Sequence, residues 1–343
     1  MVKTALVLLA VAATALSAEE TPAPAGGYKI IKKFALGGDG FWDYLTIDSA
    51  AQKLYIGRST RVMIVDMASE KLEAEIGGMT GVHGAAIVPD ANRGFVTSGK
   101  DNTVRVFDLK TQKETDRLTA GKKPDAIIYD PFSKSVFAFN NGGTTATIID
   151  PVAGKVTGEI ELGGAPEFGV ADGKGTVFVN LEDKSQIVVI DSKNMKVLNH
   201  WPLAPGEAPT GLAMDLEHRR LFSGCSGSKT MVVVDADSGK IVASLPIGAG
   251  VDATAFDKDS QNAFSSNRDG TLTVIHEDSP DSFHVIQKVQ TQPGSKTMAL
   301  DPKSHTLWLA AAEMKDAPEG AAEQNRQHKT VAPGSFSVII VGK

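Results

Sequence analysis

The stretch that decides the fold reads TGLAMDLEHRRLFSGCSGSKTMVVVDADSGKIVASLPI and runs from Thr210 to Ile247. It contains four short apolar runs separated by turns, and aspartates close the first run at Asp215 and the third at Asp235. Apolar and β-branched residues that roughly alternate over such short runs are typical of β-strands. The stretch therefore predicts four consecutive strands joined by tight turns.

The same pattern recurs along the chain with a period of about 42 residues, which indicates a repeat architecture. The first run of each copy closes at an equivalent position, at Asp48, Val88, Asp130, Asp172, Asp215, Asp257 and Asp301. An aromatic residue follows six or seven positions later, at Tyr55, Phe95, Phe137, Phe178, Phe222, Phe264 and Trp308. The strand-end aspartates are expected to fix the turns through hydrogen bonds from side chain to backbone. The chain therefore contains seven copies of a four-strand unit.

The seventh copy lacks a fourth run, because its third run ends at Val341 and the sequence ends at Lys343. The early segment Tyr28–Leu36 has the missing pattern. A strand from this segment would complete the last blade and remove an exposed sheet edge. We therefore predict an all-β fold over residues 28–343, a seven-bladed β-propeller of four-stranded antiparallel blades in which the N-terminal strand closes the last blade.

The repeat resembles that of the YVTN-repeat β-propeller family of exported bacterial proteins. The segments Leu54–Arg58 and Gly94–Ser98 lie where that family has its eponymous tetrapeptide, although neither spells it in full. The resemblance covers residues 28–343 and implies the propeller fold. It implies no particular activity, because one fold supports many functions.

The N-terminus has the order of charged, apolar and small residues found in secretory signal peptides. Lys3 precedes an apolar stretch from Ala5 to Ala13, and small residues follow up to Ala18. The apolar stretch is shorter than the about 20 residues of a transmembrane helix. We therefore predict a signal peptide at 1–18, a flexible leader at 19–27, and a periplasmic or secreted product without a transmembrane segment. We expect this product to be a monomer.

The composition is that of an ordinary soluble globular protein, with 42% hydrophobic and 22% charged residues. A net charge of -6 and the absence of a dense basic run argue against nucleic acid as a partner. Cys225 is the only cysteine, so no disulfide can form within the chain. No serine triad or phosphate-binding glycine motif is present. These features favour a binding or scaffold protein over an enzyme.

Polar residues occupy an equivalent position in all seven copies, five residues before the end of the first strand. The first strand of a propeller blade lines the central channel, so these side chains should form a ring at the channel mouth. They are Asp43, His83, Asp125, Glu167, Thr210, Asp252 and Lys296. The second strand runs antiparallel to the first and ends at the same mouth. Its last residues include Arg58, Ser98, Asn140, Asn180, Cys225 and Asn267, of which Arg58 and Asn267 are further candidate ligand-binding residues.

Carboxylate and amide oxygens suit hard cations, so Ca²⁺ or Mg²⁺ is the cofactor that this ring would favour. The predicted metal ligands are Asp125, Glu167, Asn140 and Asn180. This set is similar to the metal cage of gluconolactonase-type propellers. That similarity implies an alternative function, a divalent-metal-dependent hydrolase acting on a lactone or ester.

A simpler interpretation is that the ring faces solvent in a wet channel. Lys296 lies between Asp252 and Asp43 in blade order, so ordinary ion pairs would account for these three residues. His83 is a single histidine, and one histidine does not make a zinc site. The other histidines show no pair spaced as metal ligands; they are His200, His218, His276, His284, His305 and His328. The leading hypothesis is therefore an exported binding or scaffold protein that presents its channel mouth to a small molecule, a cation or a protein partner.

A polar insertion at 313–333 separates the second and third strands of the seventh copy. Long loops in compact domains are often functional or else disordered. Strand direction places this loop at the channel mouth, so it is a candidate lid.

Overall fold

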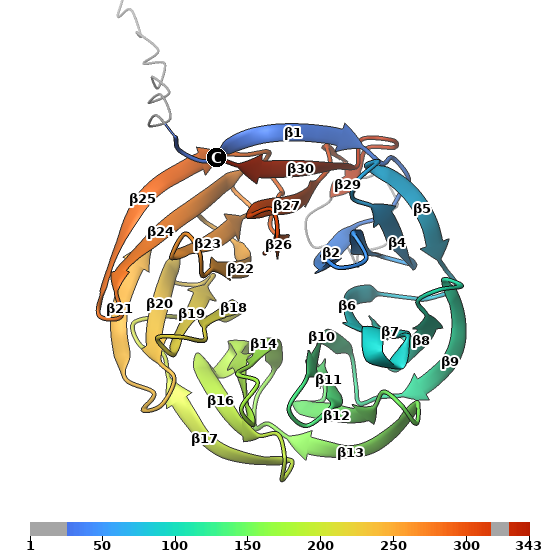
Figure 1. Ribbon diagram of the computed structural model, residues 1–343, viewed down its shortest axis with the longest axis horizontal. Coiled ribbons are helices and arrows are strands. Elements are labelled where there is room, and N and C mark those ends of the chain that lie inside the picture. The colour runs from blue at the N-terminus through green and yellow to red at the C-terminus, as the bar shows by residue number, and fades with distance from the viewer. Residues whose placement is uncertain (1–25, 317–328) are drawn as a thin grey trace, which may run out of the picture.

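The computed structural model describes residues 26–316 and 329–343 of the chain. The predicted signal peptide, most of the leader and the centre of the insertion lie outside these residues. The described residues form seven four-stranded antiparallel sheets and one two-stranded sheet. Figure 1 shows the four-stranded sheets arranged around a central axis, as the blades of a propeller. The predicted fold class is confirmed.

Six blades are each built from four consecutive strands. Blades 1 and 2 contain β2 (Trp42–Asp48), β3 (Lys53–Arg58), β4 (Arg61–Asp66), β5 (Lys71–Ile76), β6 (Val82–Val88), β7 (Arg93–Ser98), β8 (Thr103–Asp108) and β9 (Lys113–Thr119). Blades 3 and 4 contain β10 (Pro124–Asp130), β11 (Ser135–Asn140), β12 (Thr145–Asp150), β13 (Lys155–Glu161), β14 (Pro166–Ala171), β15 (Thr176–Leu181), β16 (Gln186–Asp191) and β17 (Lys196–Pro202). Blades 5 and 6 contain β18 (Pro209–Asp215), β19 (Arg220–Cys225), β20 (Thr230–Asp235), β21 (Ile241–Pro246), β22 (Val251–Asp257), β23 (Asn262–Asn267), β24 (Thr271–Ser279) and β25 (Ser282–Gln290).

The helical content of the described residues is limited to two short 3-10 helices, η1 (Pro89–Ala91) and η2 (Glu182–Lys184). Each has three residues and lies in a turn between two strands of one blade. Within the described part of the chain, no helix has the length and apolar character that crossing a bilayer requires.

Blade 7 is closed by both ends of the propeller, as the repeat predicts. Its strands are β26 (Met298–Asp301), β27 (Thr306–Ala311), β30 (Ser337–Gly342) and β1 (Lys29–Ala35), in the spatial order β26-β27-β30-β1. β1 pairs antiparallel with β30, and Figure 1 shows the two strands side by side. Tyr28, directly before β1, is 2% exposed, and its hydroxyl accepts a hydrogen bond from Asn262 of blade 6 over 3.1 Å. The first strand therefore completes one blade and also attaches it to the next.

The described part of the insertion forms a short antiparallel ladder of two strands, β28 (Met314–Asp316) and β29 (Lys329–Val331). It begins after β27 and returns the chain to β30. The predicted lid itself falls mainly on residues 317–328, which lie outside the described part of the chain.

The apolar core is divided into clusters that lie between neighbouring blades rather than within them. In one of them, Tyr55 and Ile64 of blade 1 pack with Val96 and Phe107 of blade 2. Sheets that pack face to face interdigitate alternate side chains from both inner surfaces. Removing one blade would therefore expose the apolar faces of its two neighbours. Tyr44 of blade 1 is an exception, because it joins the cluster between blades 3 and 4.

The strand-end aspartates fix the turns as predicted. Asp66 accepts a hydrogen bond from the backbone N–H of Ser69 over 2.8 Å, and Asp108 accepts one from Thr111 over 2.7 Å. The same contact recurs at Asp150, Asp191, Asp235 and other copies. Turn geometry alone accounts for this set of repeated acids.

Candidate functional site at the channel mouth

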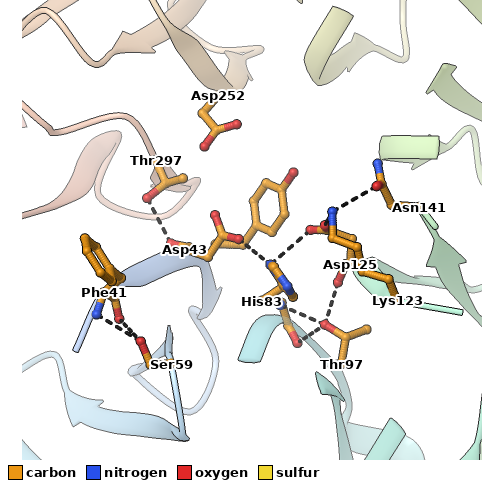
Figure 2. A network of polar contacts seen from close by, with 12 residues as sticks. Phe41, Asp43, Ser59, His83, Thr97, Lys123, Asp125, Asn141, Asp252 and Thr297 are labelled. Atoms are coloured by element: carbon orange, nitrogen blue, oxygen red, sulfur yellow. Dashed lines mark hydrogen bonds and ion pairs between the residues drawn. The ribbon is translucent and has the colours of Figure 1, made fainter. Parts of the chain in front are cut away.

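Five of the predicted ring residues form a continuous polar network at one end of the propeller axis. Lys296, in the loop before β26, lies 2.9 Å from Asp43 of β2 and also pairs with Asp252 of β22. Oδ2 of Asp43 lies 2.6 Å from Nδ1 of His83 on β6, with which it forms a hydrogen bond. The same nitrogen lies 3.2 Å from Oδ1 of Asp125 on β10. Figure 2 shows Asp43 and Asp125 on either side of the imidazole.

Two residues that the sequence analysis missed extend the network to Glu167 on β14. Lys123 lies 3.5 Å from Asp125 and donates a hydrogen bond to the side-chain oxygen of Asn141 over 2.9 Å. Asn141 donates in turn to Oε1 of Glu167 over 2.9 Å. Lys123 precedes a ring residue by two positions, and Asn141 directly follows Asn140. A comparison of the repeat over a wider window would therefore have identified both.

Negative and positive groups alternate along the network, so neighbouring groups stabilise each other's charged form. Burial alone would raise the pKa of Asp43, but Lys296 and His83 outweigh burial and lower this pKa to about 2. Burial would lower the pKa of Lys296, yet the adjacent carboxylates of Asp252 and Asp43 raise it above its usual value. Burial also opposes the charged form of His83, but Asp43 and Asp125 raise the pKa of this imidazole. Opposite charges at close range therefore favour the ionised forms of Asp43, His83 and Lys296.

The ring carboxyls of Asp125 and Glu167 are in a different state. Burial raises the pKa of Asp125, and the attraction of His83 does not offset it. Burial raises the pKa of Glu167 well above its usual range, and the charge of Asp125 adds to this effect. Glu167 is therefore the ring carboxyl that most readily holds a proton, and a protonated carboxyl donates a hydrogen bond.

Tyr44, which the sequence analysis did not consider, crosses the propeller axis beside the ring. Its backbone belongs to β2 of blade 1, but its aromatic ring packs against Phe168 of blade 4, with 5.1 Å between ring centroids. Its hydroxyl lies 3.4 Å from Oε2 of Glu167, and the residue is 5% exposed. Burial raises the pKa of Tyr44 well above its usual value, and four ring carboxylates raise it further. A phenol ring therefore occupies the axis where the simpler interpretation assumed water.

Two of the four predicted metal ligands do not face the mouth, which corrects the predicted cage. Asn140 is fully buried, and its Nδ2 donates to the hydroxyls of Thr145 and Thr147 of the same blade, over 2.9 Å each. Asn180 is also fully buried, and its Nδ2 donates to the backbone carbonyl of Thr210 over 3.0 Å. Residues at a strand end can turn either toward solvent or into the blade, and sequence position does not distinguish these cases. Asp125 and Glu167 remain at the mouth without the two amides.

Arg58 is a structural residue and does not reach the ring. It is fully buried, and its Nη2 donates to the backbone carbonyls of Asp39 and Gly40 over 2.6 and 3.0 Å. Its guanidinium carbon lies 3.7 Å from the ring centre of Phe336 in blade 7. The side chain thus fixes the connection between β1 and β2.

Thr210 and Asn267 are likewise bonded to the backbone. The Thr210 hydroxyl donates to the carbonyl of Val251 over 2.9 Å, and Asn267 donates to the carbonyl of Thr271 over 3.0 Å. Cys225 is buried, and burial raises the pKa of its thiol to about 11. These strand ends therefore hold the blades together.

Comparison with known proteins agrees with the propeller fold. The model of a family described as YNCE-like beta-propeller matches residues 78–258. The chain belongs to the YNCE-like β-propeller family. This membership confirms the propeller family that the repeat predicted.

Two further comparisons bear on this YNCE-like propeller. A search of curated protein sequences finds no match to it. A chain of the solved structure "Crystal Structure of Mitotic Checkpoint Complex" superposes with a TM-score of 0.72 at 12% identity, over 97% of this chain and 98% of that one. At such low identity the likeness shows the fold alone.

The YNCE-like propeller has a hollow of about 190 Å³ beside the ring, which Lys296 lines from the ring side. Phe41, Trp42 and Met314 supply its apolar wall. Phe41 is 43% exposed and Met314 38% exposed, whereas Trp42 is buried. Arg268 lines the same hollow, and among the described residues it has no ion pair, while Lys296 has two. The hollow therefore combines an apolar wall with an exposed guanidinium that is not ion-paired to any described residue.

Replacing Asp43 by Asn is expected to lower the free energy of unfolding by about 2 kcal/mol at pH 7. The pKa of Asp43 is about 2 in the fold, against a reference value of 3.8. A depressed carboxyl pKa stabilises the fold above the unfolded pKa and loses this contribution as the pH falls toward the folded one. The free energy of unfolding, measured with urea, should therefore fall more steeply between pH 4 and pH 2 for the natural chain than for Asp43→Asn.

The matched control is Asp39→Asn, because the side chain of Asp39 is 94% exposed. Exposed ion pairs contribute little, so this variant should stay within about 0.5 kcal/mol of the natural chain. Equal pH profiles for the natural chain and Asp43→Asn would contradict the network described here.

Proposed function

We propose that this YNCE-like propeller is an exported, non-enzymatic binding protein that takes a small organic carboxylate at its channel-mouth face. The hollow beside Lys296 is the observation that carries the proposal. The Arg268 guanidinium, which has no ion pair within residues 26–316 and 329–343, is a strong partner for a carboxylate, since it can donate two parallel hydrogen bonds. The wall formed by Phe41, Trp42 and Met314 favours a ligand whose other end is apolar or aromatic.

The size of the hollow favours a compact ligand. Its volume of about 190 Å³ is smaller than the about 300–1,000 Å³ of pockets that bury drug-sized molecules. An aromatic monocarboxylate of the size of benzoate or phenylacetate matches both the volume and the chemistry. Export is inferred from the N-terminal sequence from Lys3 to Ala18.

The hydrolase alternative needs a metal ion at the ring, where ligand atoms of Asp43, His83 and Asp125 lie within 4.8 Å of one another. The ring acids Asp43 and Asp252 are paired with Lys296, and Asp125 lies close to His83 and Lys123. A hard cation at the mouth would have to displace these cationic partners. The amide nitrogens of Asn140 and Asn180 are hydrogen-bonded inside the blades, and the oxygen of Asn180 accepts a hydrogen bond from Ser223.

The proposal is tested by titrating benzoate and phenylacetate into the protein, with benzyl alcohol as the uncharged comparison. Tryptophan fluorescence and calorimetry report binding, because Trp42 lines the hollow. We expect both carboxylates to bind and benzyl alcohol to bind at least about 10-fold more weakly, since a hydrogen bond to a charged group contributes about 1.5–3 kcal/mol.

The decisive variant is Arg268→Gln, which should weaken carboxylate binding about 10-fold or more. Arg117→Gln is its control, because the side chain of Arg117 is 57% exposed on β9 of blade 2. The proposed function is wrong if neither carboxylate binds at millimolar concentration, or if Arg268→Gln binds them as tightly as the natural chain.

A further inference from the structure

A second cluster of titratable groups lies at the opposite end of the blades from the ring. Asp215 ends β18, His218 lies in the turn that follows, and Glu277 lies in β24 of blade 6. Nδ1 of His218 is 2.8 Å from Oδ2 of Asp215 and 3.0 Å from Oε1 of Glu277. The side chains of both acids are 1% exposed, whereas that of His218 is 31% exposed. The cluster thus joins blades 5 and 6 and is reached from solvent past the imidazole.

Glu277 occupies a repeat position, directly after the equivalent of the third-strand end in the other blades, where the other copies have no acid. Its backbone N–H donates to the carbonyl of Gln261, and the equivalent N–H groups of Met67 and Leu109 make the equivalent bond in blades 1 and 2. Blades 3, 4 and 5 place Pro151, Ser192 and Ala236 there. The fold therefore accepts an apolar or small residue at this site, and no turn or strand requires a carboxylate.

The Glu277 carboxylate is buried without hydrogen bonds. Among the described residues, neither of its oxygens has a hydrogen-bond partner, and neither does Nδ1 of His218. The nearby cation Arg220 is committed elsewhere, because it donates to Asp235 over 2.7 Å and to Asp281 over 3.2 Å. A buried carboxylate left in this state is costly unless a cation accompanies it.

Nδ1 of His218 thus lies at ion-pair distance from both acids without being aligned on either oxygen as a hydrogen-bond donor. At the ring, by contrast, the imidazole of His83 does form a hydrogen bond with Asp43. Three donor atoms that approach one another without bonding to one another are typical of ligands that share a central ion. Around a tetrahedral Zn²⁺, with bonds of about 2.0–2.2 Å, neighbouring donor atoms lie about 3.3 Å apart.

We propose that Asp215, His218 and Glu277 bind a divalent transition-metal ion, with Zn²⁺ as the preferred metal. One imidazole nitrogen and two carboxylate oxygens are ligands that zinc accepts, and three protein ligands leave a fourth position for water. Three donors that include a nitrogen do not suit Ca²⁺, which takes six to eight oxygens. The ion would connect blades 5 and 6 on the face away from the carboxylate hollow.

Burial raises the pKa of Glu277 to about 7, and the nearby Asp215 adds to this. A bound cation would remove the unfavourable proximity of the two acids.

The test uses protein purified without a polyhistidine tag, stripped with chelator, and titrated with Zn²⁺ by calorimetry. We expect one ion per chain and a melting temperature that rises by about 5 °C at saturating Zn²⁺. Glu277→Leu and His218→Gln should each weaken zinc binding about 100-fold. We expect Glu277→Leu to fold, because Leu109 occupies the equivalent position in blade 2.

His305→Gln is the matched control, because His305 lies 3.1 Å from Asp257 on the same face but forms a hydrogen bond with it. This variant should bind Zn²⁺ as the natural chain does. The proposal is overturned if the stripped protein binds no Zn²⁺ at micromolar concentration, if either ligand variant keeps its affinity, or if Ca²⁺ stabilises the protein and Zn²⁺ does not.

Discussion

A chain from which residues 28–36 have been deleted should fail to remain a stable monomer. The deletion removes β1, so β30 becomes an edge strand with a free row of backbone groups. It also removes Tyr28, which packs against Phe264 with 5.2 Å between ring centroids. We expect a loss of stability on the order of 5 kcal/mol, comparable with the total stability of many domains, and a melting temperature lower by about 10 °C or more.

Size-exclusion chromatography and thermal unfolding measure this loss, and a chain that begins at residue 26 is the control, since it keeps the whole strand. A deleted chain that elutes as a monomer and melts with the control would show that the blade does not need its fourth strand.

Replacing Lys296 by Met should destabilise the fold by about 3 kcal/mol, because breaking a buried ion pair leaves uncompensated charges. Two acids, Asp43 and Asp252, would lose their partner together, and the side chains of all three residues are 17% exposed. Urea unfolding at pH 7 measures the change. Lys258→Met is the control, because the side chain of Lys258 is 78% exposed, and it should change stability by less than about 0.5 kcal/mol.

A second substitution shows whether the effect comes from the charges. Adding Asp252→Asn to Lys296→Met removes one of the two stranded acids, so the double variant should recover part of the loss. Stability of Lys296→Met within about 0.5 kcal/mol of the natural chain would mean that water, rather than the ammonium group, screens these carboxylates.

The fold could be predicted from the sequence because the same pattern of strands and turns recurs in every copy of the repeat. The acids at Asp48, Asp130 and Asp215 and the aromatics that follow them have a regular spacing, which comes from turns and strands of constant length. The closure was also readable, because Tyr28–Leu36 has the pattern of the run that the seventh copy lacks. Local patterns such as these depend on neighbouring residues only.

Only part of the candidate site could be predicted from the sequence. Position in the repeat brought Asp43, His83 and Asp125 together correctly as neighbours in a ring. The orientation of a strand-end amide such as Asn140 depends on which hydroxyl groups lie in the next strand, and the spacing of residues does not show this. The reach of Tyr44 to Glu167, 123 positions away, depends on the curvature of the whole ring.

The cluster of His218 and Glu277 illustrates the same limit and one way past it. The spacing of histidines says nothing about acids from other blades, so it did not show that Asp215 and Glu277 lie beside His218. Comparing the copies column by column would have shown that Glu277 stands where Met67 and Leu109 stand elsewhere. In a repeat protein, a buried charged residue at a position where the other copies have apolar or small residues is therefore worth testing for a role beyond folding.

The position of Tyr44 has a consequence for how the disc can work. Its ring joins blade 1 to blade 4, which are not neighbours, so a substitution at Tyr44 would remove a contact that spans the channel as well as the contact beside Glu167.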